Sequence, residues 1–197
     1  MTSTVRVVLA SRSPRRIELL SRIGHAAEVI PADIDETQHQ SESAVDYVRR
    51  MSREKASVIH ERCPDAVVLG ADTCVELDGV VHGQPANRDE AVQTLRTLSG
   101  RTHNVHTAVT VIWTQGSRTK SETLIDTARV TFQPLSDHLL QWYVDTGEPF
   151  GKAGAYAIQG QGGVLATRVQ GAMSTVVGLP LRQTAGLLSL ALADSGC

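Results

Sequence analysis

The sequence predicts an α/β fold in which helices flank a mixed sheet. Two short apolar runs, residues 5–10 and 66–70, have the composition and length of buried strands. Residues 105–113 and 124–132 alternate apolar and polar side chains, as long antiparallel strands do. Helical patterns lie between these runs, and such an order of strands and helices is typical of a mixed sheet.

The first two helical patterns begin and end at residues that favour helix termini. Pro14 suits the first position of a helix, and Gly24 ends that helix. After a loop, a longer helix starts at Ser41 or Ser43 and reaches about residue 62. The remaining expected elements are, in order, a hairpin over 75–81, a helix over 87–98, a helix over 135–146, a glycine-rich segment over 151–163, a strand over 164–169 and a helix over 180–193.

Length and composition restrict the class of protein. The 197 residues predict a single domain, 1–197, with a sizeable core. A composition of 41% hydrophobic and 20% charged residues is that of an ordinary globular protein rather than a disordered one. The net charge of -2 gives no overall positive field for binding duplex nucleic acid. The sequence has no apolar run long enough for a membrane span and no signal-peptide pattern. The three cysteines, Cys63, Cys74 and Cys197, are expected to be reduced thiols of a cytoplasmic protein.

A basic turn follows the first predicted strand. Ser11, Arg12 and Ser13 lead into the helix, and Arg15 and Arg16 occupy its first turn. A helix N-terminus attracts phosphate, whereas cations there are unfavourable for the helix itself, so the two arginines indicate an external anion. The alternative is a solvated face with salt bridges, for example to the nearby Glu18.

Asp72 follows the apolar run 66–70, where a strand is expected to end. Ligands gather outside the carboxyl ends of strands in open α/β sheets. A carboxylate there holds a divalent metal or takes a proton from water, and Thr73 adds a hydroxyl. The alternative is that Asp72 caps a turn.

Lys55 lies on the apolar stripe of the second helix, between Met51 and Val58. An ammonium group that points inward needs an anionic partner. A phosphate or Glu36, in the preceding loop, would serve. The alternative is a stem that lies along apolar surface with its charge in solvent.

The glycine-rich segment 151–160 carries Lys152 and Gln159. Its glycines allow close approach of the backbone to a ligand, Lys152 supplies a cation, and Gln159 both donates and accepts hydrogen bonds. The alternative is a plain turn. Together these segments indicate a protein that binds phosphate or hydrolyses a polyphosphate with Mg²⁺ or Mn²⁺.

Seven blocks of the sequence, in order, resemble the Maf family of nucleoside triphosphate pyrophosphatases. They are LASRSPRR (9–16), EKA (54–56), LGADT (69–73), LSGRTH (98–103), TGEP (146–149), KAGAYAIQG (152–160) and VGLPL (177–181). The resemblance implies hydrolysis of a nucleoside triphosphate to the monophosphate and pyrophosphate with a divalent metal, Mg²⁺ or Mn²⁺. It also implies a curved sheet and two lobes around a central cleft, as in inosine-triphosphatase-like folds, and a homodimer.

The resemblance also assigns roles to residues. Asp72 is the proton acceptor for the attacking water, and Glu36 and Asp72 lie at the metal. The residues that hold the triphosphate are Ser11, Ser13, Arg16, Lys55 and Lys152.

Three positions that differ between branches of the family are Arg15, Thr73 and Gln159 in this sequence. Their combination resembles the branch that acts on dTTP and UTP, rather than the branch for 7-methyl-GTP. Gln159 complements the carbonyl and imide edge of thymine or uracil with one donor and one acceptor.

Two positions depart from the family pattern. Gln84 replaces a lysine, which removes one cation, and Gly151 replaces an acidic residue. These departures leave open a nucleotide-binding regulator of septum formation and cell-division arrest with weak or no catalysis. A purine pyrophosphatase of the inosine-triphosphate type is the neighbouring enzymatic alternative.

Overall fold

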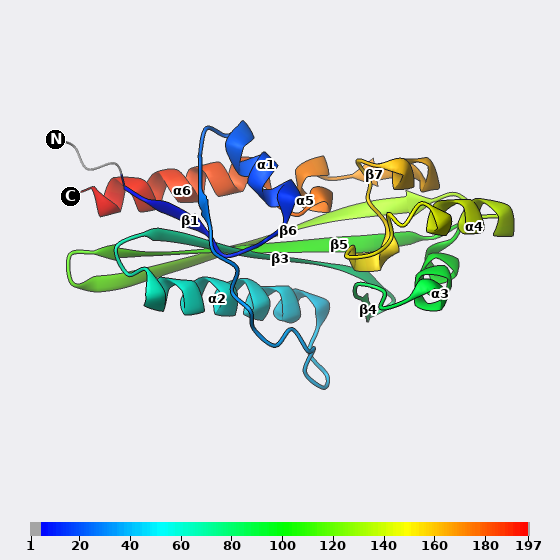
Figure 1. Cartoon of the computed structure of the whole chain (residues 1–197), viewed down its shortest axis with the longest axis horizontal. Coiled ribbons are helices and arrows are strands. Elements are labelled where there is room, and N and C mark those ends of the chain that lie inside the picture. Colours follow the sequence, from blue (N-terminus) through cyan, green and yellow to red (C-terminus); the bar gives the residue numbers. More distant parts are fainter. Residues whose placement is uncertain (1–4, 197) are drawn as a thin grey trace. The chain divides into compact units, whose positions relative to one another are not determined.

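The computed structural model describes residues 5–196 and confirms an α/β fold with a mixed sheet flanked by helices (Figure 1). The strands are β1 (Val7–Leu9), β2 (Glu28–Val29), β3 (Val67–Leu77), β4 (Val80–His82), β5 (Thr102–Gln115), β6 (Arg118–Phe132) and β7 (Ala166–Gln170). The helices are α1 (Pro14–Arg22), α2 (Ala44–Arg62), α3 (Arg88–Leu98), α4 (Asp137–Asp145), α5 (Met173–Val177) and α6 (Leu181–Ser195), with short 3₁₀ turns η1 (Ala153–Ala155) and η2 (Gln161–Leu165).

The strand order among the described residues is β2-β1-β3-β5-β6-β7, and β4 pairs with β3. β1 is parallel to both β2 and β3, whereas β4 is antiparallel to β3 and β7 to β6. The long strands β5 and β6 form an antiparallel hairpin. Their side-chain hydrogen bonds show this direction, since the residue numbers increase along β5 while those of the partners in β6 decrease. These pairs are Thr102–Thr131 (2.8 Å), His106–Thr127 (2.9 Å) and Thr110–Thr123 (2.8 Å).

The chain forms two compact units. The first unit contains described residues 5–72, 107–126 and 178–196, and the second contains 73–106 and 127–177. Strands β3, β5 and β6 contribute residues to both units. The expected single domain and the expected cleft stay predictions.

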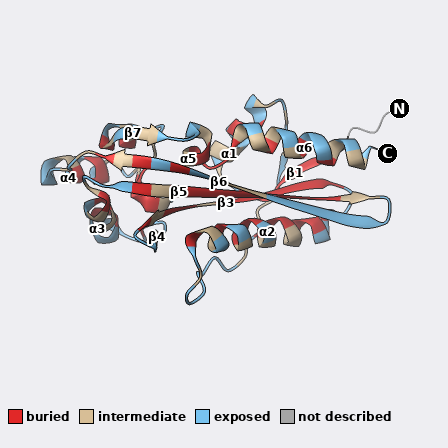
Figure 2. Cartoon of the chain, turned by 180° about the vertical axis from the view of Figure 1, so that it is seen from behind, coloured by how far each residue is buried: buried red, intermediate tan, exposed pale blue. Residues whose placement is uncertain are grey.

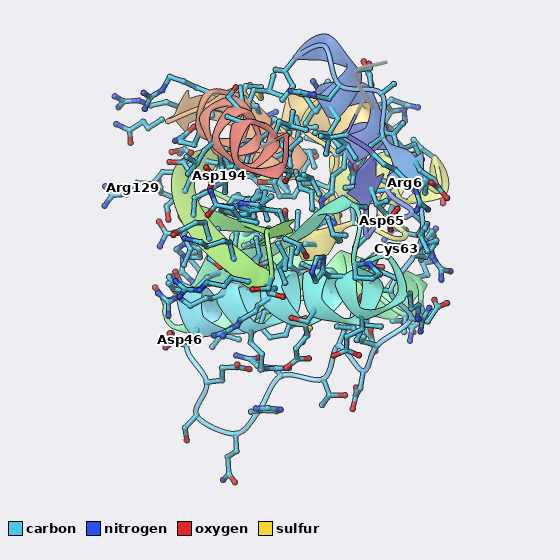
Figure 3. The ribbon with its side chains drawn as sticks, turned by 90° about the vertical axis from the view of Figure 1, so that its left-hand side faces the viewer. Arg6, Asp46, Cys63, Asp65, Arg129 and Asp194 are labelled. Atoms are coloured by element: carbon cyan, nitrogen blue, oxygen red, sulfur yellow. The ribbon has the colours of Figure 1, made fainter. Side chains whose placement is uncertain are left out.

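In the first unit, α2 covers one face of the sheet, and α1 and α6 lie over the other (Figure 1). One core cluster of this unit joins β1, α2 and β3 through Val8, Ala56, Ile59 and Val68. At the edge of the unit, Arg6 donates a hydrogen bond to Glu28 (2.8 Å) and lies beside Cys63 and Asp65 (Figure 3).

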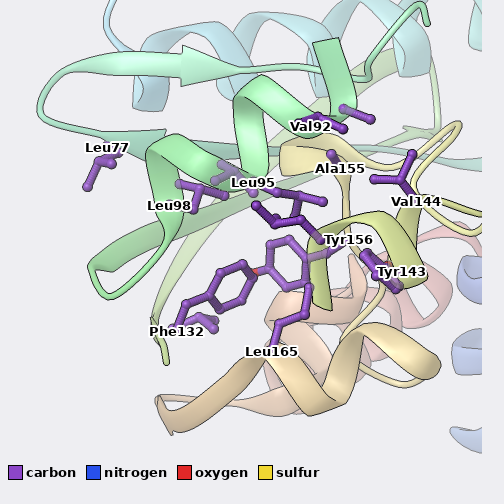
Figure 4. Close-up of a cluster of buried hydrophobic side chains, with 14 of the residues drawn as sticks. Leu77, Val92, Leu95, Leu98, Phe132, Tyr143, Val144, Ala155, Tyr156 and Leu165 are labelled. Atoms are coloured by element: carbon purple, nitrogen blue, oxygen red, sulfur yellow. The ribbon is translucent and has the colours of Figure 1, made fainter. Parts of the chain in front are cut away.

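The core of the second unit is rich in aromatic residues (Figure 4). Phe132 and Tyr156 meet edge to face with ring centroids 4.8 Å apart, and the His103 ring packs against both. Nε2 of His103 lies 2.8 Å from the Tyr156 hydroxyl. Burial lowers the pKa of His103 to about 4, so this imidazole is a neutral part of the core at physiological pH.

The structure corrects the expected end of the second apolar strand. Instead of ending before Asp72, β3 continues to Leu77, so Asp72 lies within the strand. The pairing of β3 with β1 ends at Leu69, but β3 also has β5 as its neighbour on the other side, and β4 pairs with it from Val75. Asp72 therefore lies beyond the end of β1 rather than beyond the end of its own strand.

Other differences concern length and short elements. β5 and β6 extend beyond the alternating stretches 105–113 and 124–132. The added part of β6, from residue 118 to residue 123, is polar and exposed to solvent (Figure 2). The two-residue β2 and the five-residue α5 were not expected, since neither is long enough to show a period.

The structure also bears on the cysteines and on membrane spans. Cys63 and Cys74 are buried and form no disulfide among residues 5–196, whereas Cys197 and residues 1–4 lie outside the described residues. Among residues 5–196, no helix has the length and apolarity that crossing a membrane requires.

Candidate active site

The basic turn after β1 folds as the start of α1. Ser13 is the N-cap, and its carbonyl oxygen accepts hydrogen bonds from the amides of Arg16 (3.1 Å) and Ile17 (3.2 Å). The Ser13 amide donates to Oγ of the buried Ser11 (3.2 Å). The first turn of the helix carries Arg15 and Arg16 and no acidic residue, so no carboxylate of this turn complements the positive end of the helix dipole.

Arg16 is fixed by two hydrogen bonds. Its Nε donates to the carbonyl oxygen of Gly178 (3.0 Å), and its Nη1 donates to Oγ of Ser11 (3.2 Å). The expected alternative partner, Glu18, instead pairs with Arg22 on the helix surface (2.6 Å). Arg16 is therefore a positioned guanidinium rather than part of that surface pair.

Gly70 allows α2 to pack closely against β3. A Cβ atom at this position would lie 2.3 Å from the carbonyl oxygen of Ser52 and 2.7 Å from the amide nitrogen of Ala56. Both atoms belong to the backbone of α2. Because alternate residues of a strand face the same side, Asp72 points toward the same helix as the space above Gly70.

Lys55 of α2 lies between two carboxylates. Its Nζ is 2.7 Å from Oδ1 of Asp72 and 2.8 Å from Oε1 of Glu36. The side chains of Lys55 and Asp72 are 10% and 9% exposed, whereas that of Glu36 is 49% exposed. Lys55 is thus an inward ammonium group with carboxylate partners, which excludes the alternative of a charge that reaches solvent.

The charges of this cluster influence one another. Burial raises the pKa of Asp72, and the positive charges of Lys55 and Arg16 oppose that rise. Burial also lowers the pKa of Arg16, against the effect of Asp72. Asp72 and Arg16 are thus near enough for their charges to interact, and both belong to the first unit.

The loop that carries Glu36 is tied to α2. The Tyr47 hydroxyl donates to the carbonyl oxygen of Glu36 (3.0 Å), and Nη2 of Arg50 donates to that of Thr37 (3.0 Å). Arg50 also binds both carboxylate oxygens of Glu42, each at 2.7 Å. These contacts hold the loop where the carboxylate of Glu36 reaches the ammonium group of Lys55.

The neighbouring acids of the loop have other partners. Asp33 accepts from Arg12, and Asp35 accepts from the amide (2.9 Å) and hydroxyl (2.7 Å) of Thr37. These hydrogen bonds lower the pKa of Asp35. Within the described chain, Glu36 is therefore the acid of this loop that joins the site.

Two carboxylates suit one mode of binding a divalent metal. The described residues contain no cluster of three or more histidine, cysteine or acidic side chains arranged to hold a metal ion. Mg²⁺, however, is commonly held by one or two carboxylates together with the phosphates of a substrate. Glu36 and Asp72, whose carboxylates Lys55 now links, supply oxygen ligands of this type.

The other expected site residues belong to different surroundings. Arg15 is half-buried in the first turn of α1, and Thr73 follows Asp72 in β3. Lys152 and Gln159 lie in the second unit, where Nζ of Lys152 donates to the carbonyl oxygen of Phe150 (3.1 Å) and Gln159 is exposed. Thr73 also belongs to the second unit, whereas the first unit contains Ser11, Ser13, Arg15, Arg16, Glu36, Lys55 and Asp72.

The two departures from the family pattern have simple local settings. Gln84 is exposed. Gly151 is also exposed and has a φ of +70°, a backbone conformation that glycine adopts more readily than an acidic residue.

Several residues that shape the site were not singled out from the sequence. Tyr47 and Arg50 position the Glu36 loop, and Gly178 accepts from Arg16. An isolated glycine within a strand pattern is a signal of close backbone approach, and it could have identified Gly70. The arginine and tyrosine carried no comparable signal, because their partners lie in a loop without a period.

Comparison with known proteins gives the relatives of this chain. A family model described as Maf-like protein matches residues 6–191. The chain is 50% identical over 185 residues to the dTTP/UTP pyrophosphatase of Myxococcus xanthus, covering 94% of this chain and 92% of that protein. It is 43% identical over 181 residues to the dTTP/UTP pyrophosphatase of Bacillus velezensis, covering 92% and 94%.

Among solved structures, the chain is similar to the Ham1 protein of Staphylococcus aureus, with a TM-score of 0.45 and 14% identity over 93% of this chain and 98% of that one. The assignment to a family rests on the sequence matches instead. With the family model matched from residue 6 to residue 191, this chain belongs to the Maf family.

Proposed function

We propose that this protein hydrolyses dTTP and UTP to the corresponding monophosphates and pyrophosphate. The observation that carries the proposal is the cluster in which Lys55 joins the carboxylates of Glu36 and Asp72. Relatives with 50% identity over more than nine-tenths of this chain bear the name of that activity.

In the proposed reaction, a water molecule attacks the α-phosphorus, and the bond from that phosphorus to the bridging oxygen of the β-phosphate breaks. Pyrophosphate leaves with the bonding electrons, and the proton of the water passes to Asp72. A buried carboxylate close to the attacking water can serve as this proton acceptor.

The triphosphate brings several negative charges, which the protein's cations offset. Arg16 and Lys55 supply two of them in the first unit, and Ser11 and Ser13 offer hydroxyl groups at the start of α1. The family resemblance adds Lys152 to this set. A guanidinium held at two of its nitrogens is already oriented when the substrate arrives, which reduces the entropic cost of binding.

A divalent metal, Mg²⁺ or Mn²⁺, completes the proposal. Glu36 and Asp72 would hold it, and when bound it would neutralise phosphate charge. Lys55 would then exchange part of its carboxylate contact for contact with phosphate. The hard oxygen ligands of these two residues support Mg²⁺ as the usual ion.

The nucleobase is proposed to contact Arg15, Thr73 and Gln159. The amide of Gln159 matches one carbonyl and one N–H of thymine or uracil. The exposure of Gln159 is consistent with a ligand contact. A nucleotide-binding regulator with weak or no catalysis is not favoured, since relatives with 50% identity bear the name of the enzymatic activity.

We further propose a cytoplasmic homodimer without nucleic-acid or membrane partners. The absence of a disulfide at Cys63 and Cys74 among the described residues is consistent with a reducing compartment, and the net charge of -2 gives no general attraction to nucleic acid. The homodimer rests on the family resemblance. Light scattering of the purified protein measures its mass directly.

A substrate panel tests the proposed activity. Pyrophosphate release is measured from dTTP, UTP, dCTP, CTP, ITP and 7-methyl-GTP, with and without Mg²⁺ or Mn²⁺. We expect the highest kcat/KM for dTTP and UTP and no turnover without metal. Faster release from 7-methyl-GTP would refute the pyrimidine assignment, and faster release from ITP would favour a purine pyrophosphatase.

A further inference from the structure

Gln159 lies in a tight turn of the second unit. The Gly160 amide donates to the carbonyl oxygen of Ala157 (3.1 Å), and the Gly163 amide donates to that of Gly160 (3.1 Å). Gln159 is the third residue of the first of these turns. The direction of its exposed side chain therefore depends on how the turn is fixed to the rest of the unit.

Two side chains from α4 and the turn after it fix both ends of this segment. Before Gln159, the Ala157 amide donates to the Tyr143 hydroxyl (3.1 Å). After it, the amides of Gln161 and Gly162 donate to Oε1 (3.0 Å) and Oε2 (2.8 Å) of Glu148. One carboxylate thus satisfies two consecutive amides at the start of η2, which a neutral amide side chain cannot do equally well.

The glycines of the segment make room for these anchors. A Cβ atom on Gly160 would lie 1.9 Å from Oε1 of Glu148, and one on Gly162 would lie 2.6 Å from the Tyr143 hydroxyl oxygen. Gly160 has φ -105° and ψ -150°, which other residues also adopt. Glycine is therefore required at position 160 by the carboxylate beside it rather than by its backbone angles.

We propose that Glu148, assisted by Tyr143, is a positioning residue that sets nucleobase selectivity through Gln159. This inference rests on the proposed function. Glu148 touches the backbone on the C-terminal side of the Gln159 turn and fixes where the amide of Gln159 is presented. Hydrogen-bonding sites discriminate strongly only when their groups are held in place, so a loosened turn loses selectivity before it loses the chemistry.

The test measures kcat and KM for dTTP and dCTP in Glu148→Gln. We expect KM for dTTP to rise about 10-fold with kcat within about 3-fold, and the preference for dTTP over dCTP to fall by about 5-fold or more. Tyr143→Phe, which removes only the hydroxyl, should change selectivity in the same direction. Asp145→Asn is the matched control, because Asp145 is an acid at the end of α4 that pairs with Arg88 on the surface.

A double-mutant cycle with Gln159→Ala separates positioning from general loss of structure. If Glu148 acts through Gln159, Glu148→Gln should change the selectivity of Gln159→Ala by less than about 2-fold. An equal loss of selectivity in both backgrounds would overturn the inference, and so would parent-like selectivity in Glu148→Gln. If Glu148→Gln does not fold, Gly160→Ala disturbs the same contact from the other side, and parent-like selectivity there overturns the inference.

The parent enzyme distinguishes this inference from the proposed function. A parent that releases no pyrophosphate from dTTP contradicts the proposed function. If the parent prefers dTTP and Glu148→Gln has the same preference, only the inferred role of Glu148 is contradicted, and the proposed function stands.

Discussion

The ammonium group of Lys55 lies 2.7 Å from the carboxylate of Asp72, and both side chains are almost fully buried. The helix of Lys55 reaches the strand of Asp72 because Gly70 has no side chain. A second carboxylate, Glu36, approaches the same ammonium group from a loop that Tyr47 and Arg50 hold in place. Backbone packing thus brings together the charges that the proposed hydrolysis uses.

Removing Lys55 is expected to cost more stability than changing Asp72. Lys55→Met leaves the buried Asp72 without its cation, and the loss of one partner of a buried ion pair costs about 3–5 kcal/mol. Asp72→Asn leaves Lys55 paired with Glu36, so its cost is expected to be smaller. Urea unfolding of both variants measures the free energies. A Lys55→Met protein as stable as Asp72→Asn would contradict the bridging role of the lysine.

Gly70→Ala is expected to destabilise the protein by about 3 kcal/mol or more, because the new methyl group meets the backbone of α2. Gly186→Ala is the matched control. It lies in α6 with open space around its missing Cβ, so the same change should stabilise by about 0.5–1 kcal/mol. Thermal unfolding should therefore show shifts of opposite sign, and equal shifts would contradict the close packing at Gly70.

Arg16→Lys is expected to raise KM for dTTP about 10-fold. An ammonium group cannot bind the Gly178 carbonyl and Ser11 together while facing a phosphate, as the planar guanidinium does. Arg22→Lys, at the surface pair with Glu18, serves as the control and should retain parent kinetics. Equal KM values for Arg16→Lys and the parent would show that the two hydrogen bonds do not orient a phosphate ligand.

The free energy of unfolding should depend on pH through the ionisation of Glu42. Its bidentate contact with Arg50 lowers the pKa of Glu42 to about 2 in the folded protein. A lowered carboxyl pKa stabilises the fold above the unfolded value near 4.5 and loses that effect as pH falls toward 2.

The measurement compares unfolding of the parent and Glu42→Gln from pH 7 to pH 2. We expect the variant to be less stable by about 1 kcal/mol at pH 7, since solvent screening reduces what the pKa shift alone implies. The difference should shrink as pH falls. A constant difference over this range would mean that ionised Glu42 does not stabilise the fold through Arg50.

Much of this fold follows from local sequence signals. Ser43, one of the two expected starts of the second helix, caps α2 through a side-chain hydrogen bond. Asn87 and Ser136 cap α3 and α4 in the same way, at or within one residue of the expected starts of these helices. The ends of long strands were less predictable. A polar residue such as Asp72 reads as a break, whereas its strand continues because new neighbours pair with it.

The candidate site was predictable in its residue types and only partly in its arrangement. The inward position of Lys55 and its carboxylate partner followed from the apolar stripe of its helix and the cost of a buried charge. The contacts of Arg50 with the Glu36 loop and of Glu148 with the Gln159 turn depend on how irregular segments fold back. Such segments have no period from which their partners can be read.

The most direct test compares pyrophosphate release and nucleotide binding for the parent and Asp72→Asn. With dTTP and Mg²⁺, we expect the parent to form dTMP and pyrophosphate, and the variant to lose at least about 100-fold in kcat, as removal of a general base does. Its Kd for dTTP, measured without metal, should stay within about 3-fold of the parent value, since Arg16 and Lys55 remain. Parent-like turnover by a folded Asp72→Asn protein would contradict the role of Asp72 as the proton acceptor.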